Sequence, residues 1–100
     1  MKSMDTLSKV IIYESRDEKN TSLETAEIKE NGDLVLEGYG VGEVCERVWG
    51  DGDYEYWLTI DKKWKDTILL LLAQERFKSF GDFRQWLDEK KIPNQFQNWV

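Results

Sequence analysis

The chain of 100 residues contains no histidine, and this absence narrows its chemistry. Without imidazole it lacks the usual general base near neutral pH, a Ser-His or Cys-His nucleophile pair and imidazole metal ligands. The single cysteine, Cys45, excludes an internal disulfide and, with no histidine, argues against a structural zinc site. Cys45 falls on the apolar side of a predicted helix, so we interpret it as a small core residue rather than a nucleophile.

Long apolar runs are also missing. The longest, from Ile68 to Ala73, is far shorter than the ~20 residues needed to span a membrane. Residues 1–5 lack the apolar region of a signal peptide, so we expect a soluble, cytoplasmic protein with no membrane partner. The glycine-rich segment 38–42 has neither the spacing nor the Lys-Ser/Thr pair of a phosphate-binding loop. We therefore expect no cofactor.

The composition that is present suits one compact globular domain over residues 1–100, with 40% hydrophobic and 34% charged residues. The net charge of −6 is unevenly distributed, because residues 1–60 carry −8 and residues 61–100 carry +2. A negative field repels phosphate backbones and attracts basic proteins, which disfavours direct nucleic-acid binding. The alternative is that the charge only keeps a small domain soluble.

The strongest local signal is the turn 30–32 (Glu-Asn-Gly), which separates two strand-like runs, 23–29 and 33–39, and predicts a β-hairpin. A two-residue turn would pair Ile28 with Val35. A three-residue loop with Gly32 in the left-handed region shifts the register by one residue, places apolar residues on one face and joins opposite charges. We favour this second register. Its predicted pairs are Ile28–Leu34, Ala26–Leu36 and Lys29–Asp33.

The rest of the chain predicts two more strands and three helices. The run 10–13 (Val-Ile-Ile-Tyr) is apolar on both sides, which is typical of an inner strand, with an edge strand as the alternative. Residues 54–60 alternate as a half-buried strand does. Apolar spacing and capping residues predict helices over residues 41–49, after Asp61 and after Ser79.

The predicted order is β-β-β-α-β-α-α, and residues 94–100 form either a last short edge strand or an aromatic tail. Helices that come late beside a mainly antiparallel sheet indicate an α+β two-layer fold, with the helices on one face. Because a terminus is ordered only by contacts, we expect Phe96 and Trp99 to pack back on the strand 54–60 or on the helix that carries Trp86.

The segment 49–57 departs furthest from ordinary core or surface composition, because it combines two Trp, two Tyr and three carboxylates. Alternation places Trp57 on the face opposite Tyr54 and Tyr56, either as a cover for a second packed element or as an exposed anchor. An exposed Trp among carboxylates has the composition of a binding hot spot. The predicted partner-binding residues are Glu46, Trp49, Asp51, Asp53, Glu55 and Trp57.

The alternating carboxylates of Asp51, Asp53 and Glu55 resemble the start of a calcium loop, but the match then fails. Tyr56 stands at the sixth position, where an EF-hand needs Gly, and Lys62 stands at the twelfth, where it needs Glu. We therefore expect no metal site and no catalytic residues. A small carboxylate-dependent enzyme, with two acids converging in a pocket, stays an alternative.

Two motifs carry a resemblance. Trp49-Gly50-Asp51-x-Asp53-Tyr54-Glu55-Tyr56 and Phe83-Arg84-x-Trp86-Leu87-x-Glu89-x-x-Ile92-Pro93-x-x-Phe96 together resemble a family of small bacterial proteins that carries no known activity. The resemblance covers roughly residues 33–99. It implies a bacterial or phage setting and nothing about catalysis. In size and charge the chain is also similar to small immunity proteins and phage-encoded inhibitors.

These observations favour a non-enzymatic protein-binding module of the inhibitor, immunity or adaptor type, which presents an acidic, aromatic surface to a basic partner. One alternative is a nucleic-acid mimic, which would place its carboxylates in regular rows on one face. Exposed strand edges also allow self-association, so we expect a monomer or a weak homodimer.

Overall fold

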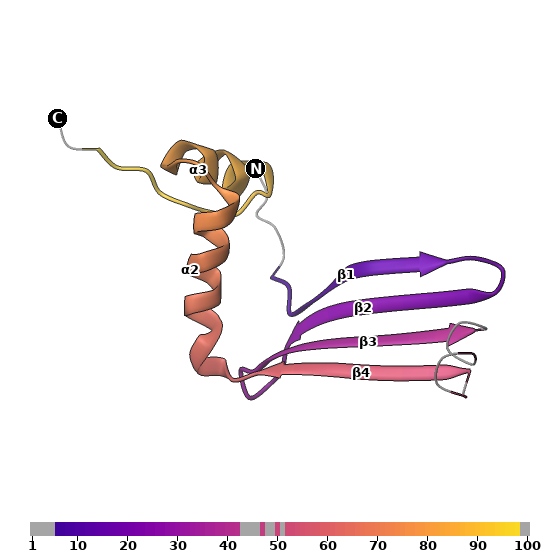
Figure 1. The fold of residues 1–100 in the computed structure, drawn as a ribbon. Coiled ribbons are helices and arrows are strands. Elements are labelled where there is room, and N and C mark those ends of the chain that lie inside the picture. Colours follow the sequence, from indigo (N-terminus) through magenta and orange to yellow (C-terminus); the bar gives the residue numbers. More distant parts are fainter. Residues whose placement is uncertain (1–5, 43–46, 48–49, 51, 99–100) are drawn as a thin grey trace. The chain divides into compact units, whose positions relative to one another are not determined.

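The computed structural model describes residues 6–42, 47, 50 and 52–98 (Figure 1). The described elements follow the order β-β-β-β-α-α, which confirms the predicted α+β class. The chain divides into two compact units, named here the sheet unit (residues 7–65) and the helical unit (residues 1–6 and 66–100). A single compact domain with helices layered on one sheet face stays a prediction.

The sheet unit is an antiparallel meander. Its strands are β1 (Lys9–Arg16), β2 (Asn20–Ile28), β3 (Leu34–Gly42) and β4 (Asp53–Ile60). They lie in the order β1-β2-β3-β4, so each pairs with its neighbour along the chain (Figure 1). The inner-strand interpretation of residues 10–13 is therefore wrong and the edge-strand alternative is right, because β1 ends the sheet and all its residues are exposed.

The hairpin between β2 and β3 has the predicted register, with Ile28 opposite Leu34 and Ala26 opposite Leu36. Gly32 has a φ of 96°, a conformation that costs other residues a steric penalty. The backbone N–H of Lys29 donates to the carbonyl oxygen of Asp33 at 2.9 Å, which closes the loop. The three-residue loop with Gly32 in the left-handed region is confirmed.

Asp33 also joins this loop to the point where the chain leaves the sheet. Its Oδ1 accepts a hydrogen bond from the backbone N–H of Lys62 at 2.9 Å. Asp61 directly follows β4 and caps the short 3-10 helix η1 (Lys62–Trp64), because its side chain accepts a hydrogen bond from the backbone N–H of Lys63 at 2.9 Å. The predicted helix start at Asp61 is confirmed.

The pairing registers sort the side chains onto two faces of the sheet, because residues directly opposite each other share a face. The acidic-aromatic face carries Glu27, Glu37, Tyr39, Asp53, Glu55 and Trp57. The apolar face carries Val10, Tyr13, Ala26, Ile28, Leu34, Leu36, Tyr54, Tyr56, Leu58 and Ile60. Val35 and Thr25, on the acidic-aromatic face, are buried, at 8% and 7% exposure.

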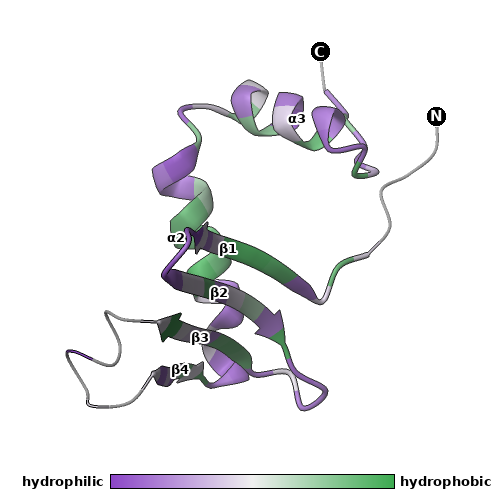
Figure 2. Cartoon of the chain, turned by 90° about the vertical axis from the view of Figure 1, so that its right-hand side faces the viewer, coloured by the Kyte–Doolittle hydropathy of each residue, from purple (hydrophilic) through white to green (hydrophobic). Residues whose placement is uncertain are grey.

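Strand β1 is irregular near its centre. Ile11 lies opposite Thr25 and Tyr13 lies opposite Glu24, so Ile12 is an extra residue that forms a β-bulge. The middle of this strand is coloured as strongly hydrophobic in Figure 2.

One side chain crosses the middle of the apolar face. Glu24, Gly38 and Tyr56 lie side by side on β2, β3 and β4. The Tyr56 ring passes over Gly38, and its hydroxyl donates a hydrogen bond to Glu24 Oε2 at 2.7 Å. Gly38 is buried beneath the ring, and its lack of a side chain is what admits this contact.

The helical unit contains α2 (Lys65–Arg76) and α3 (Phe80–Glu89). Ser79 caps α3 as predicted, because its Oγ accepts from the backbone N–H of Asp82 at 3.1 Å. Phe77, in the connection between the helices, stacks on Phe83 with ring centroids 4.4 Å apart and meets the edge of Trp86 at 5.7 Å. This aromatic cluster packs the residue that follows α2 against α3.

The end of α3 is a Schellman motif, in which a residue in the left-handed region closes the helix. Lys91 takes this position with a φ of 59°, and its N–H donates to Asp88 O at 3.1 Å. The N–H of Ile92 donates to Leu87 O at 2.9 Å, and Pro93 then prevents continuation.

The C-terminal segment packs on α3. The Phe96 ring lies 5.9 Å from the Phe80 ring, and the Arg84 guanidinium lies 4.5 Å from the Phe96 centroid. The predicted return of Phe96 to the helix that carries Trp86 is confirmed, and Trp99 lies outside the described residues. Residues 94–98 are not in a strand, so over this part the aromatic-tail alternative holds.

The predicted helix over residues 41–49 falls mostly on residues 43–46 and 48–49, which lie outside the described part of the chain together with Cys45. Val41, predicted as its first apolar position, belongs to β3 instead and lies opposite Thr21. The reason is that β2 begins at Asn20, earlier than the predicted strand-like run 23–29, and gives β3 a longer partner.

Candidate acidic-aromatic binding surface

Strand β4 places three of the predicted partner-binding residues on one face. Asp53, Glu55 and Trp57 alternate along the strand, so their side chains share the acidic-aromatic face. All three are exposed, and Trp57 is 60% exposed despite its size. Trp57 was predicted either to cover a second packed element or to be exposed, and in the structure its side chain is exposed. Glu46, Trp49 and Asp51 lie outside the described residues.

Strand β3 supplies neighbours to this surface that sequence reasoning missed. Glu37 lies opposite Trp57, and Tyr39 lies opposite Glu55. On the next strand, β2, Thr25 lies opposite Glu37 and Leu23 lies opposite Tyr39. The signal that could have found them is the β3–β4 register, but the long connection between these strands left it undetermined from the sequence.

These side chains border a shallow hollow of about 370 Å³ on the acidic-aromatic face. Its floor is formed where the small, buried Thr25 and Gly38 lie between larger side chains. Its lining residues are Lys9, Leu23, Thr25, Glu37, Gly38, Tyr39, Glu55 and Trp57. The hollow therefore joins apolar and aromatic surface to the carboxylates of Glu37 and Glu55.

Charge is unevenly paired across this face. The Lys29 ammonium lies 3.0 Å from Glu27 and 3.6 Å from Glu37. The hydrogen bond from Lys29 lowers the pKa of Glu27, and the same bond raises the pKa of Lys29. Among the described residues Glu55 forms no such ion pair. On this face Glu27 and Glu37 therefore share the Lys29 ammonium, whereas Glu55, on the same strand as Trp57, does not.

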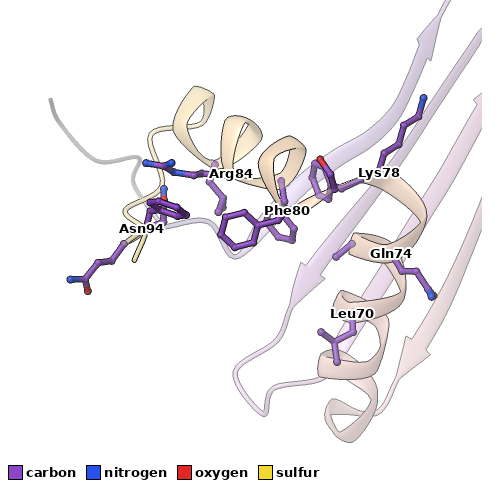
Figure 3. Close-up of a pocket in the computed structure, with 13 residues that line it drawn as sticks. Leu70, Gln74, Lys78, Phe80, Arg84 and Asn94 are labelled. Atoms are coloured by element: carbon purple, nitrogen blue, oxygen red, sulfur yellow. The ribbon is translucent and has the colours of Figure 1, made fainter. Parts of the chain in front are cut away.

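The helical unit has a larger apolar hollow, of about 760 Å³, which no motif predicted. It lies between α2, α3 and the C-terminal segment, and Figure 3 shows Leu70 and Gln74 on α2, Phe80 and Arg84 on α3, and Asn94 on that segment. The sequence feature that accompanies it is the recurrence of Phe77, Phe80 and Phe83 at every third residue around the connection between the helices, and all three line the hollow.

Two kinds of site are not found in the described part of the chain. No group of three or more His, Cys, Asp or Glu residues there is placed to hold a metal ion. None of the described helices has the length and apolar character that crossing a membrane requires.

Comparison with protein-family models, with curated proteins and with solved structures finds no significant match to this chain.

Proposed function

We propose that the chain is a non-enzymatic, cytoplasmic protein-binding module of bacterial or phage origin, of the inhibitor, immunity or adaptor type. Its acidic-aromatic face would bind a basic patch on a partner protein. The observation that carries this proposal is the exposure of Trp57, which lies opposite Glu37 and two residues from Glu55 on β4, at the border of a hollow. A large exposed aromatic among carboxylates combines apolar contact area with charge that steers association.

The position of the surface supports a binding role. Four strands hold these side chains at fixed spacings, and a rigid scaffold lowers the entropy lost when a partner binds. Burying a large apolar side chain stabilises the folded state by about 1.5–3 kcal/mol. The exposed indole of Trp57 does not make this contribution in full. A partner that covers Trp57 would gain this free energy of burial on binding.

The arrangement of charges favours a protein partner over the nucleic-acid mimic. A mimic needs carboxylates in continuous rows that imitate a phosphate backbone. Across the row of the sheet that carries Glu55, the next side chains are Tyr39 and Leu23, and across the row of Trp57 they are Glu37 and Thr25. Aromatic and apolar groups therefore interrupt the negative surface.

The proposal is tested by affinity capture from an extract of the native host with four immobilised forms of the protein. The forms are the parent, Glu55→Lys, Trp57→Ser and the control Glu30→Lys. Glu30→Lys makes the same charge change at an exposed position in the β2–β3 loop, away from the surface. We expect a captured protein with a basic patch that the first two variants lose and the control keeps.

The captured protein, once purified, allows a sharper measurement. Charge reversal at Glu55 should lower its association rate constant and the salt dependence of that rate, because steering by opposite charge is screened by salt. Retention of the partner by both Glu55→Lys and Trp57→Ser would contradict the surface assignment. Displacement of the chain by added DNA would transfer the support to the mimic.

A further inference from the structure

Strand β1 offers a second surface, which the proposed function does not use. It ends the sheet, and among the described strands only β2 pairs with it. Its central residues 10–13 (Val-Ile-Ile-Tyr) are 42% to 61% exposed. An edge strand with free backbone groups and exposed apolar side chains pairs readily with another strand.

We propose that β1 pairs antiparallel with β1 of a second copy of this chain, about a two-fold axis, so that two four-stranded sheets become one. A two-fold arrangement is the usual symmetry of a homodimer and requires the strand to be complementary to itself. The sequence of β1 meets that requirement. Centring the axis between Ile11 and Ile12 opposes Lys9 to Glu14 of the second copy, Val10 to its Tyr13 and Ile11 to its Ile12.

The bulge in β1 makes this pairing geometrically consistent. Lys9 and Glu14 are five residues apart, so in a regular strand their side chains would lie on opposite faces. The extra residue Ile12 shifts the alternation by one. Lys9 therefore lies opposite Glu27 and Glu14 opposite Leu23, and both belong to the acidic-aromatic face.

The same shift applies to the apolar pair. Val10 lies opposite Ala26 and Tyr13 lies opposite Glu24, so both belong to the apolar face. In the proposed dimer the Lys9–Glu14 pairs thus lie on the acidic-aromatic face and the Val10–Tyr13 pairs on the apolar face. The two extra Ile12 residues lie near the axis, one on each strand. A bulged strand facing a regular one would match side chains on only one side of the bulge, whereas two related bulges match the pairs that flank the axis on both sides.

Charge complementarity selects the second copy as the occupant. The ends of the apolar run carry opposite charges, Lys9 and Glu14, and antiparallel self-pairing brings each beside its opposite. Proline and lysine at a sheet edge commonly block pairing with another strand. The run 10–13 contains neither.

The test is sedimentation equilibrium of the full chain and five variants between about 10 µM and about 1 mM, the range in which a weak dimer exchanges with monomer. Ile11→Lys places a charge at the centre of the pairing and should raise the dimer dissociation constant at least tenfold. The control Leu70→Lys makes the same change at an exposed leucine of α2 and should leave it unchanged. Circular dichroism confirms that each variant is folded.

The other three variants test the register. Lys9→Glu alone and Glu14→Lys alone each oppose like charges twice per dimer. Cross-strand charge pairs are worth roughly 0.2–1 kcal/mol each, so the dissociation constant should rise about 2- to 30-fold. The double variant Lys9→Glu/Glu14→Lys restores opposite charges and should restore the dimer. A mass that stays at 11.9 kDa throughout overturns the proposal. A dimer unaffected by Ile11→Lys, or one not restored by the double variant, overturns it as well.

Discussion

Replacing Gly38 by alanine tests how the centre of the sheet is held together. A Cβ added at Gly38 would lie 2.2 Å from Cε2 and 2.3 Å from Cζ of the Tyr56 ring. These distances are far below van der Waals contact, so the ring must move away from β3. Its hydroxyl then leaves Glu24, to which it donates at 2.7 Å.

The magnitude follows from two opposing effects. A hydrogen bond to a charged acceptor contributes about 1.5–3 kcal/mol, which the displaced ring gives up. Alanine inside a strand is favoured over glycine by roughly 0.5–1 kcal/mol, because glycine loses more backbone entropy on folding. We therefore expect Gly38→Ala to lower the free energy of unfolding by about 0.5–2.5 kcal/mol. At about 4–8 °C for each kcal/mol, Tm should fall by roughly 2–20 °C.

Urea denaturation followed by circular dichroism measures the change in two backgrounds. In Tyr56→Ala the ring is absent, so the same Gly38→Ala substitution should become stabilising by roughly 0.5–1 kcal/mol. The control Gly81→Ala adds a Cβ that meets only Ser79 Oγ, at 3.9 Å, and should stabilise α3. The reasoning is refuted if Gly38→Ala is neutral in the parent, or if it is equally harmful without the ring.

Three further predictions concern turns and helix ends. Asp17→Asn should reduce the loss of stability in acid. The backbone N–H groups of Lys19 and Asn20 donate to the Asp17 carboxylate and lower its pKa. The stability that this carboxylate contributes is therefore present above the ordinary aspartate range and is lost as pH falls through the lowered pKa. Urea midpoints at neutral and strongly acidic pH measure this difference. Gly32→Ala should lower the free energy of unfolding by about 1–2 kcal/mol, because alanine is strained at a φ of 96°; thermal denaturation measures it. Lys91→Gly should raise Tm, because glycine relieves a left-handed conformation that costs other residues about 1–2 kcal/mol.

Each of these has an outcome that contradicts it. An Asp17→Asn variant with the same acid-induced loss as the parent would show that the turn carboxylate does not contribute. A Gly32→Ala variant as stable as the parent would require a different loop conformation. A Lys91→Gly variant of lower Tm would mean that the contacts of the lysine side chain outweigh its backbone strain.

Features set by neighbouring residues were predictable from the sequence. Asn31 and Gly32 select a loop, and the loop decides the register of β2 on β3 through residues close in the chain. The caps at Asp61 and Ser79 are equally local, since each side chain accepts from an amide two or three residues later. The alternation of residues 54–60 likewise identified β4 and the face that carries Trp57.

Features that depend on distant partners were not predictable. An apolar run such as 10–13 has the same pattern in an inner strand and in an exposed edge, so β1 was placed only by the order of the sheet. Thr21 and Ser22 have a loop-like composition, but the extended β3 supplies hydrogen-bonding partners that draw them into β2. Glu37 became part of the candidate surface through the β3–β4 register, which no local signal determines.

The meander also has a consequence for the order of folding. Every strand pairs with its neighbour along the chain, so the sheet needs no long loop closure before its first contacts form. A hairpin such as β2–β3 forms in about 1–10 μs, and the outer strands can then add to it. We expect β1 and β4 to be the last strands to join and the first to open in native-state hydrogen exchange. Since these two strands carry both proposed surfaces, neither surface is complete before the sheet is, and a partner bound to one would slow the exchange of that strand most.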